Sequence, residues 1–185
     1  TGEVRLPGFD GEWEEVRLGN IGKTFNGLSG KSAKDFGVGK PYIRYKNIFN
    51  NSKIDLKDVD YVSISENEKQ NAVRYGDIFF TTSSETPEEV GMSSVLLDIA
   101  EDLYLNSFCF GFRLNDFEIL MPEYARFIFR SESFRRDIIK LAQGSTRFNI
   151  SKNEVIKLMI MLPSIQEQKT IAQVLTTADK EIDLL

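Results

Sequence analysis

The stretch SFCFGFRLNDFEILMPEYARFIFRSESFRRDIIKLAQG, residues 107–144, decides the fold class, because the period of its apolar residues changes from two to about 3.6. From Phe108 to Leu114 every second residue is apolar, which predicts a strand with one buried face. Cys109 is predicted on the other face, among polar contacts. From Pro122 onward the apolar residues recur every three or four positions, which predicts amphipathic helices. A strand followed directly by helices indicates a mixed α/β fold.

Other short runs rich in aromatic and β-branched residues, each bounded by turn-forming residues, predict further strands. These predicted strands are Tyr42–Ile48, Tyr61–Ile64, Asp77–Thr82, Met92–Leu97 and Leu158–Leu162. Asn26–Lys40 is rich in Gly, Ser and Lys and is predicted to be a flexible loop. The fold class is therefore expected to be α/β (mixed α+β), a globular domain with a mixed or antiparallel sheet and flanking helices.

The end of the chain is predicted to be a single helix. It opens with a capping-box pattern from Ser164 to Glu167 and contains no later Gly or Pro. Its seam has alternating spacings of three and four, typical of a coiled coil, so we expect a partner helix. The pattern covers only two heptads, so an amphipathic helix on its own domain is the alternative. We divide the chain into a domain of residues 1–163 and a helix of residues 164–185, cut off in mid-pattern. The seam is Gln168, Ile171, Leu175, Ala178, Ile182 and Leu185.

Composition excludes several classes of protein. The 185 residues include no histidine and one cysteine, Cys109, so Ser-His-Asp catalysis, Cys-His catalysis and an internal disulfide are excluded. A metal would have to be held by carboxylates alone, and no metal site is predicted. No run is apolar enough for a membrane span, and the first residues lack the pattern of a signal peptide. We therefore expect a folded, soluble protein of the cytoplasm.

Charge is unevenly distributed along the chain. The net charge of −5 argues against holding nucleic acid by bulk electrostatics. However, residues 31–57 and residues 126–152 each carry seven basic and two acidic residues, whereas residues 85–102 hold six acids and no base. The acidic segment would repel phosphate and suit a protein partner. The two basic segments could form one nucleic-acid surface only if they converge in space.

A set of short motifs spans nearly the whole chain. They are Trp13 with Leu18-Gly19, Gly76-Asp77-Ile78, Gly144-Ser145-Thr146 leading to Asn149-Ile150-Ser151, and Leu162-Pro163 followed by Glu167-Gln168, Ile171, Leu175 and Asp179. In this order and at these separations, the motifs resemble the specificity subunits of type I restriction-modification systems. The last motif is similar to the start of the conserved helix of that family.

The resemblance implies DNA recognition without catalysis. In the family, each target recognition domain contacts a few base pairs of double-stranded DNA, and the conserved helix sets the distance to a second recognition domain. The assembled subunit recruits methyltransferase subunits, which bind S-adenosylmethionine, and restriction subunits, which use ATP. The resemblance therefore implies no cofactor for this chain. It implies one half of a bipartite reader, completed by a second recognition domain or by a homodimer through the terminal helix.

The side chains available for DNA contacts fall into three sets. Arg, Lys, Asn, Ser and Thr distinguish base edges, and basic or hydroxyl side chains hold phosphates. The set around Arg147 is the strongest candidate, because it lies between two predicted helices. The first set is Lys31, Lys34, Arg44, Tyr45, Lys46 and Asn47, the second is Thr81, Thr82, Ser83 and Ser84, and the third is Ser145, Thr146, Arg147, Asn149 and Lys152.

Two other classes of function stay open at the level of sequence. Asp35 and the run Asp55-Leu56-Lys57 loosely match the Asp…Asp-x-Lys arrangement of a magnesium-dependent nuclease, although Asp35 falls in the predicted loop rather than on a strand. A pure protein-interaction module would instead use the terminal helix and the acidic segment, and would read no DNA.

Overall fold

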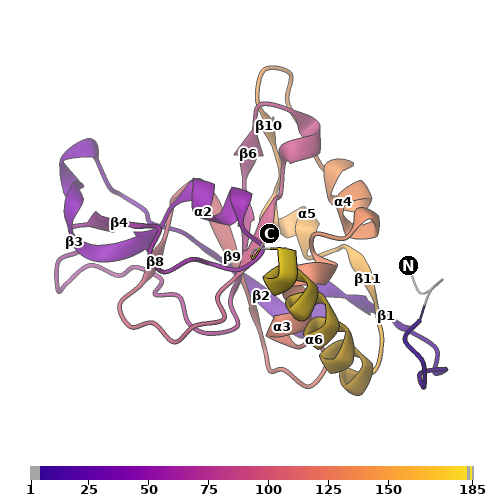
Figure 1. Ribbon diagram of the computed structural model, residues 1–185. Helices are drawn as coiled ribbons and strands as arrows, with labels where there is room; N and C mark the ends of the chain where they lie inside the picture. Colours follow the sequence, from indigo (N-terminus) through magenta and orange to yellow (C-terminus); the bar gives the residue numbers. More distant parts are fainter. Residues whose placement is uncertain (1–4, 183, 185) are drawn as a thin grey trace.

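The computed structural model describes residues 5–182 and 184 and is built around a four-stranded antiparallel sheet (Figure 1). Strand β9 pairs with β2 on one side and with β5 on the other, and β7 completes the sheet. The three strands predicted from residue 77 to residue 114 are confirmed, with their ends shifted by one or two residues. The order across the sheet is β2 (Gly22–Asn26), β9 (Cys109–Leu114), β5 (Ile78–Thr81) and β7 (Ser93–Val95).

This sheet separates two hydrophobic cores. Phe80 and Phe110 belong to one core, and Phe79 and Cys109 belong to the other. Because elements cover both faces, β5 and β9 are buried on both sides, and the predicted polar face of the 107–114 strand is wrong. Cys109 is 3% exposed, and Phe108, which the alternation placed inside, is 62% exposed.

Helices cover the first face of the sheet. α3 (Pro122–Ile128) and α4 (Glu132–Ile139) confirm the predicted change of period. Between them Phe129 and Phe134 pack edge to face, with ring centroids 4.9 Å apart. The Ser131 hydroxyl caps α4 by accepting from the Phe134 amide at 3.3 Å. Around this core lie four short elements: β1 (Glu14–Arg17), α1 (Leu18–Ile21), α5 (Lys152–Val155) and β11 (Met159–Leu162), which pairs antiparallel with β1.

The second face carries a smaller sheet and a short helix, at the left and centre of Figure 1. β3 (Phe36–Ile43) pairs antiparallel with β4 (Val59–Val62) and parallel with β8 (Tyr104–Leu105), so the fold is mixed. The predicted strand Tyr42–Ile48 is wrong in its second half, because the chain enters helix α2 (Tyr45–Asn50). Tertiary contacts described below override the β-propensity of this segment.

The predicted loop Asn26–Lys40 is partly ordered. It contains the 3₁₀ turn η1 (Ala33–Asp35) and the start of β3. The Asp35 carboxylate accepts from the amide and the hydroxyl of Ser32, both at 2.7 Å, and these bonds lower the pKa of Asp35. Asp55 accepts from the Lys57 amide at 2.9 Å. The two carboxylates of the nuclease hypothesis, Asp35 and Asp55, therefore accept hydrogen bonds that stabilise local turns.

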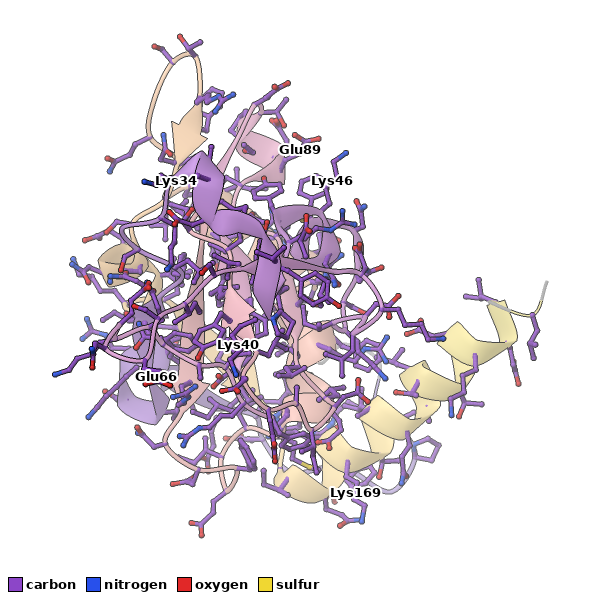
Figure 2. All side chains as sticks on the ribbon, turned by 90° about the vertical axis from the view of Figure 1, so that its left-hand side faces the viewer. Lys34, Lys40, Lys46, Glu66, Glu89 and Lys169 are labelled. Carbon is purple, nitrogen blue, oxygen red and sulfur yellow. The ribbon has the colours of Figure 1, made fainter. Side chains whose placement is uncertain are left out.

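The terminal helix α6 (Ile165–Ile182) is buried against the domain mainly in its first turns, and an ion pair from Asp179 to Arg126 holds a later turn. Gln168 is fully buried and bonds to the Met121 amide and to the carbonyls of Ile119 and Pro163, at 2.8–3.0 Å. Its predicted place in a partner-facing seam is therefore wrong. In contrast, Ile182 is 67% exposed. Figure 2 shows α6 running out beyond the body of the domain.

The N-terminal cap of α6 is half of the predicted capping box. The Glu167 amide donates to the Ser164 hydroxyl at 3.3 Å, but the Glu167 carboxylate pairs with Arg5 at 2.5 Å instead of closing the box. The last predicted seam residue, Leu185, lies outside the described residues. Within the described part of the chain, no helix combines the length and the apolar character needed to cross a membrane.

Candidate nucleic-acid interface

Three segments that are far apart in the sequence meet at one cavity of about 520 Å³. The Tyr45 hydroxyl donates to the Ser83 carbonyl at 2.6 Å, which joins α2 to the short strand β6 (Ser83–Ser84). β6 in turn pairs antiparallel with β10 (Phe148–Asn149), which follows Arg147. All three predicted contact sets are therefore represented here. The cavity is lined by Tyr45, Lys46, Phe49, Asn50, Ser83, Ser84, Glu85, Glu89, Phe108 and Arg147.

Helix α2 positions Tyr45 and Lys46 at this cavity. The rings of Tyr45 and Phe49, one turn apart, stack at 6.0 Å. Burial raises the pKa of Tyr45, and the nearby Glu89 carboxylate acts in the same direction, so the hydroxyl stays protonated and donates to Ser83. Lys46 is exposed. Figure 2 shows Lys46 and Glu89 close together on the upper part of the face.

The loop before β10 presents Arg147. Gly144 has φ +127°, and a Cβ there would lie 2.0 Å from the Arg147 carbonyl, so this tight turn requires glycine. Gln143 and Asn149 exchange backbone hydrogen bonds at 2.8 and 2.9 Å across the base of the loop. Ser145, Thr146, Arg147 and Asn149 are exposed. Figure 1 shows this loop standing at the top of the molecule, above β6 and β10.

Three predicted contact residues have structural roles, which corrects the prediction for them. Asn47 is fully buried, and its amide group donates to the carbonyls of Asp55 and Asp58 at 2.8 and 2.7 Å. Thr81 is fully buried and accepts from the Met92 amide at 3.0 Å. Ser84 is 8% exposed and donates to the Thr86 carbonyl. Their polar groups are satisfied inside the domain. They are not available to DNA bases.

Five other residues of the predicted sets do not line the cavity. Lys31 donates to the Ser63 carbonyl at 2.6 Å and pairs with Glu68, and its side chain is only 8% exposed, so it too is structural. Arg44 pairs with Asp58. Lys152 donates to the Asn26 side chain at 2.5 Å, and Thr82 is half-buried. Lys34 is exposed on η1, apart from the cavity, on the upper part of the face in Figure 2.

The basic segment 126–152 contributes less surface charge than its sequence suggests. Arg130 donates to four backbone carbonyls, and Arg135 donates to the carbonyls of Gly91, Glu88 and Val90 at 2.7–2.8 Å. Burial lowers the pKa of Arg130 to about 10, so the guanidinium stays cationic at neutral pH. These side chains stabilise loops. Only the Arg147 end of the segment reaches the cavity.

Several residues of the cavity were not predicted from the sequence. Phe49, Asn50, Glu85, Glu89 and Phe108 line the wall but were not predicted as contacts. The acidic segment was expected to face a protein partner, yet two of its glutamates, Glu85 and Glu89, share the cavity with Lys46 and Arg147. For Phe108, the turn formers Asn106 and Ser107 were the available signal, since a strand that starts after the turn leaves Phe108 outside it.

A second surface lies beside α6, on the other core of the domain. A cavity of about 870 Å³ runs between α6, α3 and β11 and is lined partly by apolar side chains. Met161 is 46% exposed, Val174 49% and Leu175 38%. Asp179 closes its outer end by pairing with Arg126 at 2.6 Å. The domain therefore leaves an apolar groove along the exposed half of its terminal helix.

Comparisons with known proteins agree on one family. The model of the type I restriction modification DNA specificity domain matches residues 10–185. The specificity subunit of the type I restriction enzyme EcoKI from Escherichia coli (strain K12) is 26% identical over 152 residues, which are 80% of this chain and 32% of that protein.

Solved structures share the fold. The crystal structure of the S subunit of a type I restriction-modification system from M. genitalium superposes with a TM-score of 0.63 at 14% identity, covering 96% of this chain and 41% of that one. A chain from a study of complex assembly and conformational transition of the type I R-M system superposes with a TM-score of 0.65 at 19% identity, covering 99% and 41%. The chain thus spans about a third of the EcoKI subunit and two-fifths of the solved chains.

Proposed function

The chain belongs to the family of type I restriction modification DNA specificity domains. On this premise we propose that it reads one half of a bipartite DNA target through the cavity between α2, β6 and β10. The observation that carries the proposal is the meeting of Tyr45 and Lys46, Ser83, and Arg147 in that cavity. Three independent segments there present the side chains that bind base edges and phosphates.

The chemistry of the cavity suits direct readout of DNA. The Arg147 guanidinium has a planar fork that matches the two acceptors of guanine in the major groove. Lys46 suits a phosphate, because its ammonium is a point charge on a flexible stem. Both are exposed, and the loop of Arg147 stands out from the body of the domain. The acidic net charge then favours selective contacts over general attraction to phosphates.

Recognition of this kind needs no reaction at the chain itself. We assign no catalytic residue and no cofactor to it. Methyltransferase and restriction subunits, with their S-adenosylmethionine and ATP, would supply the chemistry in the cytoplasm, where the DNA lies.

Assembly would use the exposed part of α6. Ile171, Leu175, Ala178 and Ile182 follow the seam spacing. Ile171 packs partly on the core of its own domain, Leu175 lines the groove, and Ile182 is exposed beyond it. A helix of a second recognition domain, or of a second copy, would cover Leu175 and Ile182, and we treat residues 1–163 as the reading domain and residues 164–185 as the assembly element. Because Gln168 is buried in its own domain, the proposed interface begins after it on the helix.

The decisive experiment uses the methyltransferase complex that contains this chain. We expect Arg147→Ala to weaken binding of its DNA target by about 1–3 kcal/mol with relaxed preference at one base pair, because one bidentate base contact is lost. If Arg147 holds a phosphate, binding falls evenly across sequences and the salt slope becomes shallower by about 0.9.

The matched control is Arg136→Ala. Arg136 is also exposed, with a side chain that is 62% accessible, but it lies on α4 and does not line the cavity. It should leave DNA binding unchanged. Equal binding by the Arg147→Ala variant and the wild type over a range of salt concentrations would contradict the proposed site. Absence of any sequence preference in the wild-type complex would contradict the proposed function.

A further inference from the structure

Phe108 is an exposed aromatic residue that lines the cavity between α2, β6 and β10. It is 62% exposed, whereas Phe110 and Phe112 on the strand that follows are 4% and 1% exposed. It lines the same cavity as Lys46 and Arg147. Single exposed apolar residues are ordinary on protein surfaces, so the exposure alone carries no meaning. Its position among the candidate DNA contacts does.

The backbone holds the ring in this position. The Phe108 amide donates to the Asn106 side chain at 2.8 Å, and its carbonyl accepts from the Thr82 amide at 3.0 Å. The next residue, Cys109, occupies the inward site of the strand and is buried in the second core. Phe108 therefore cannot turn inward without breaking the pairing of β9 with β5. The backbone bonds therefore keep the side chain outside the core of the domain.

The surroundings of Phe108 favour a DNA base over an apolar protein surface. Beside the rings of Tyr45 and Phe49, the cavity that Phe108 lines contains mostly charged and polar side chains. A protein interface of ordinary kind would extend the apolar area around such a ring. In the major groove, by contrast, the one apolar group among donors and acceptors is the C5-methyl of thymine, which packs against side chains such as Phe.

We propose that Phe108 is a specificity-determining residue that selects thymine by packing its ring against the C5-methyl group in the major groove. This inference rests on the proposed function of the cavity. Arg147 and Lys46 would place the domain on the duplex, and Phe108 would then discriminate thymine from cytosine beside them, because cytosine lacks the methyl group.

The test removes the methyl group from the DNA and the ring from the protein. The methyltransferase complex is used to select its half-site from randomised double-stranded DNA, and each thymine of that site is then replaced by deoxyuridine in turn. At one position the wild type should bind the deoxyuridine probe about four-fold more weakly, the value for burial of one methyl group. The Phe108→Ala variant should bind the two probes equally.

Two further variants control for general effects. Phe117→Ala removes another exposed phenylalanine, 43% accessible, that lies outside the cavity, and it should keep the four-fold difference. Phe108→Leu keeps an apolar side chain at the site and should retain part of the discrimination. Both variants need the same thermal unfolding midpoint as the wild type, which a surface position permits.

The other possible results separate failure of the methyl contact from failure of the proposed function. If the wild type selects a half-site but no thymine in it responds to deoxyuridine, or if the Phe108→Ala variant keeps the difference, the methyl contact is refuted and the proposed function stands. If Phe108→Ala weakens both probes equally and reduces DNA bending, the ring is a wedge between bases, and the methyl contact is again refuted. If the wild type selects no sequence at all, the proposed function itself fails.

Discussion

Replacing Arg130 should destabilise the domain far more than replacing Arg136, an exposed arginine of the same basic segment. The guanidinium lies between α3 and the end of α2, and its bonds hold that end in place. Its Nε donates at 2.6 Å and its Nη2 donates at 2.8, 3.0 and 2.8 Å, to the carbonyls of Ser93, Ile48, Phe49 and Asn51 respectively. The last three carbonyls end α2, where a cation also complements the helix dipole.

The magnitude follows from these bonds. A hydrogen bond from a charged donor contributes about 1.5–3 kcal/mol, and here three N–H groups are shared among four acceptors. Part of this gain is offset by the cost of burying the charge, which also lowers the pKa of Arg130 to about 10. We therefore expect Arg130→Met, which keeps the apolar stem, to lower the free energy of unfolding by about 3 kcal/mol, a large share of the roughly 5–15 kcal/mol of a typical domain.

Urea unfolding followed by far-ultraviolet circular dichroism and by fluorescence of the single tryptophan, Trp13, measures this loss. Arg136→Met is the matched control, since Arg136 is exposed, and it should change the free energy of unfolding by less than about 0.5 kcal/mol. A loss below about 1 kcal/mol for Arg130→Met, at an unchanged slope, would refute the role of the Arg130 clamp. So would a variant that keeps its stability but loses DNA binding, because Arg130 would then act as a contact.

Three other predictions concern the rest of the chain. Replacing Leu175 and Ile182 with Asp should reduce co-purification with methyltransferase subunits while changing the free energy of unfolding by less than about 0.5 kcal/mol; unfolding of the whole domain would show that the seam belongs to its own core. Burial raises the pKa of Tyr75 and of Tyr124 to about 12, so the unfolded chain loses these protons first, near pH ~10, and stability should fall between about pH 10 and 12. Spectrophotometric titration would contradict this if all six tyrosines ionised together. Burial also raises the pKa of the Cys109 thiol, so it should react with Ellman's reagent only on unfolding, and prompt labelling of the native protein would disprove its burial.

Local periodicity predicted the elements whose own residues carry a clear apolar pattern. The change of period after Leu114 located α3 and α4, and the apolar runs located β5, β7 and β11. It failed where distant residues decide the conformation. The segment at Tyr45 has the composition of a strand but ends as a helix, because Arg130 and Asn47 bind the backbone around it. No pattern within the segment reports those contacts.

The candidate site was also predicted only in part from the sequence. The types of side chain and the resemblance located the three segments, but burial decided which members are available. Asn47 and Thr81 look like base contacts in the sequence and are interior in the fold. Phe108 looks interior and is exposed, because an alternating pattern predicts one buried face and cannot show where the strand begins.

The burial of β5 on both faces has a consequence for how such a domain can change over generations. Phe79 and Phe80 occupy adjacent codons, yet Phe79 supports the core under α2, and Phe80 supports the core that reaches Ala172 on α6. A substitution that reshapes the cavity side can be compensated by mutations within its own core. The core that reaches α6 keeps its packing. The core under α2 can thus change by drift on one side of a single sheet, while the core under α6, the helix that we propose as the assembly element, stays under a separate selection.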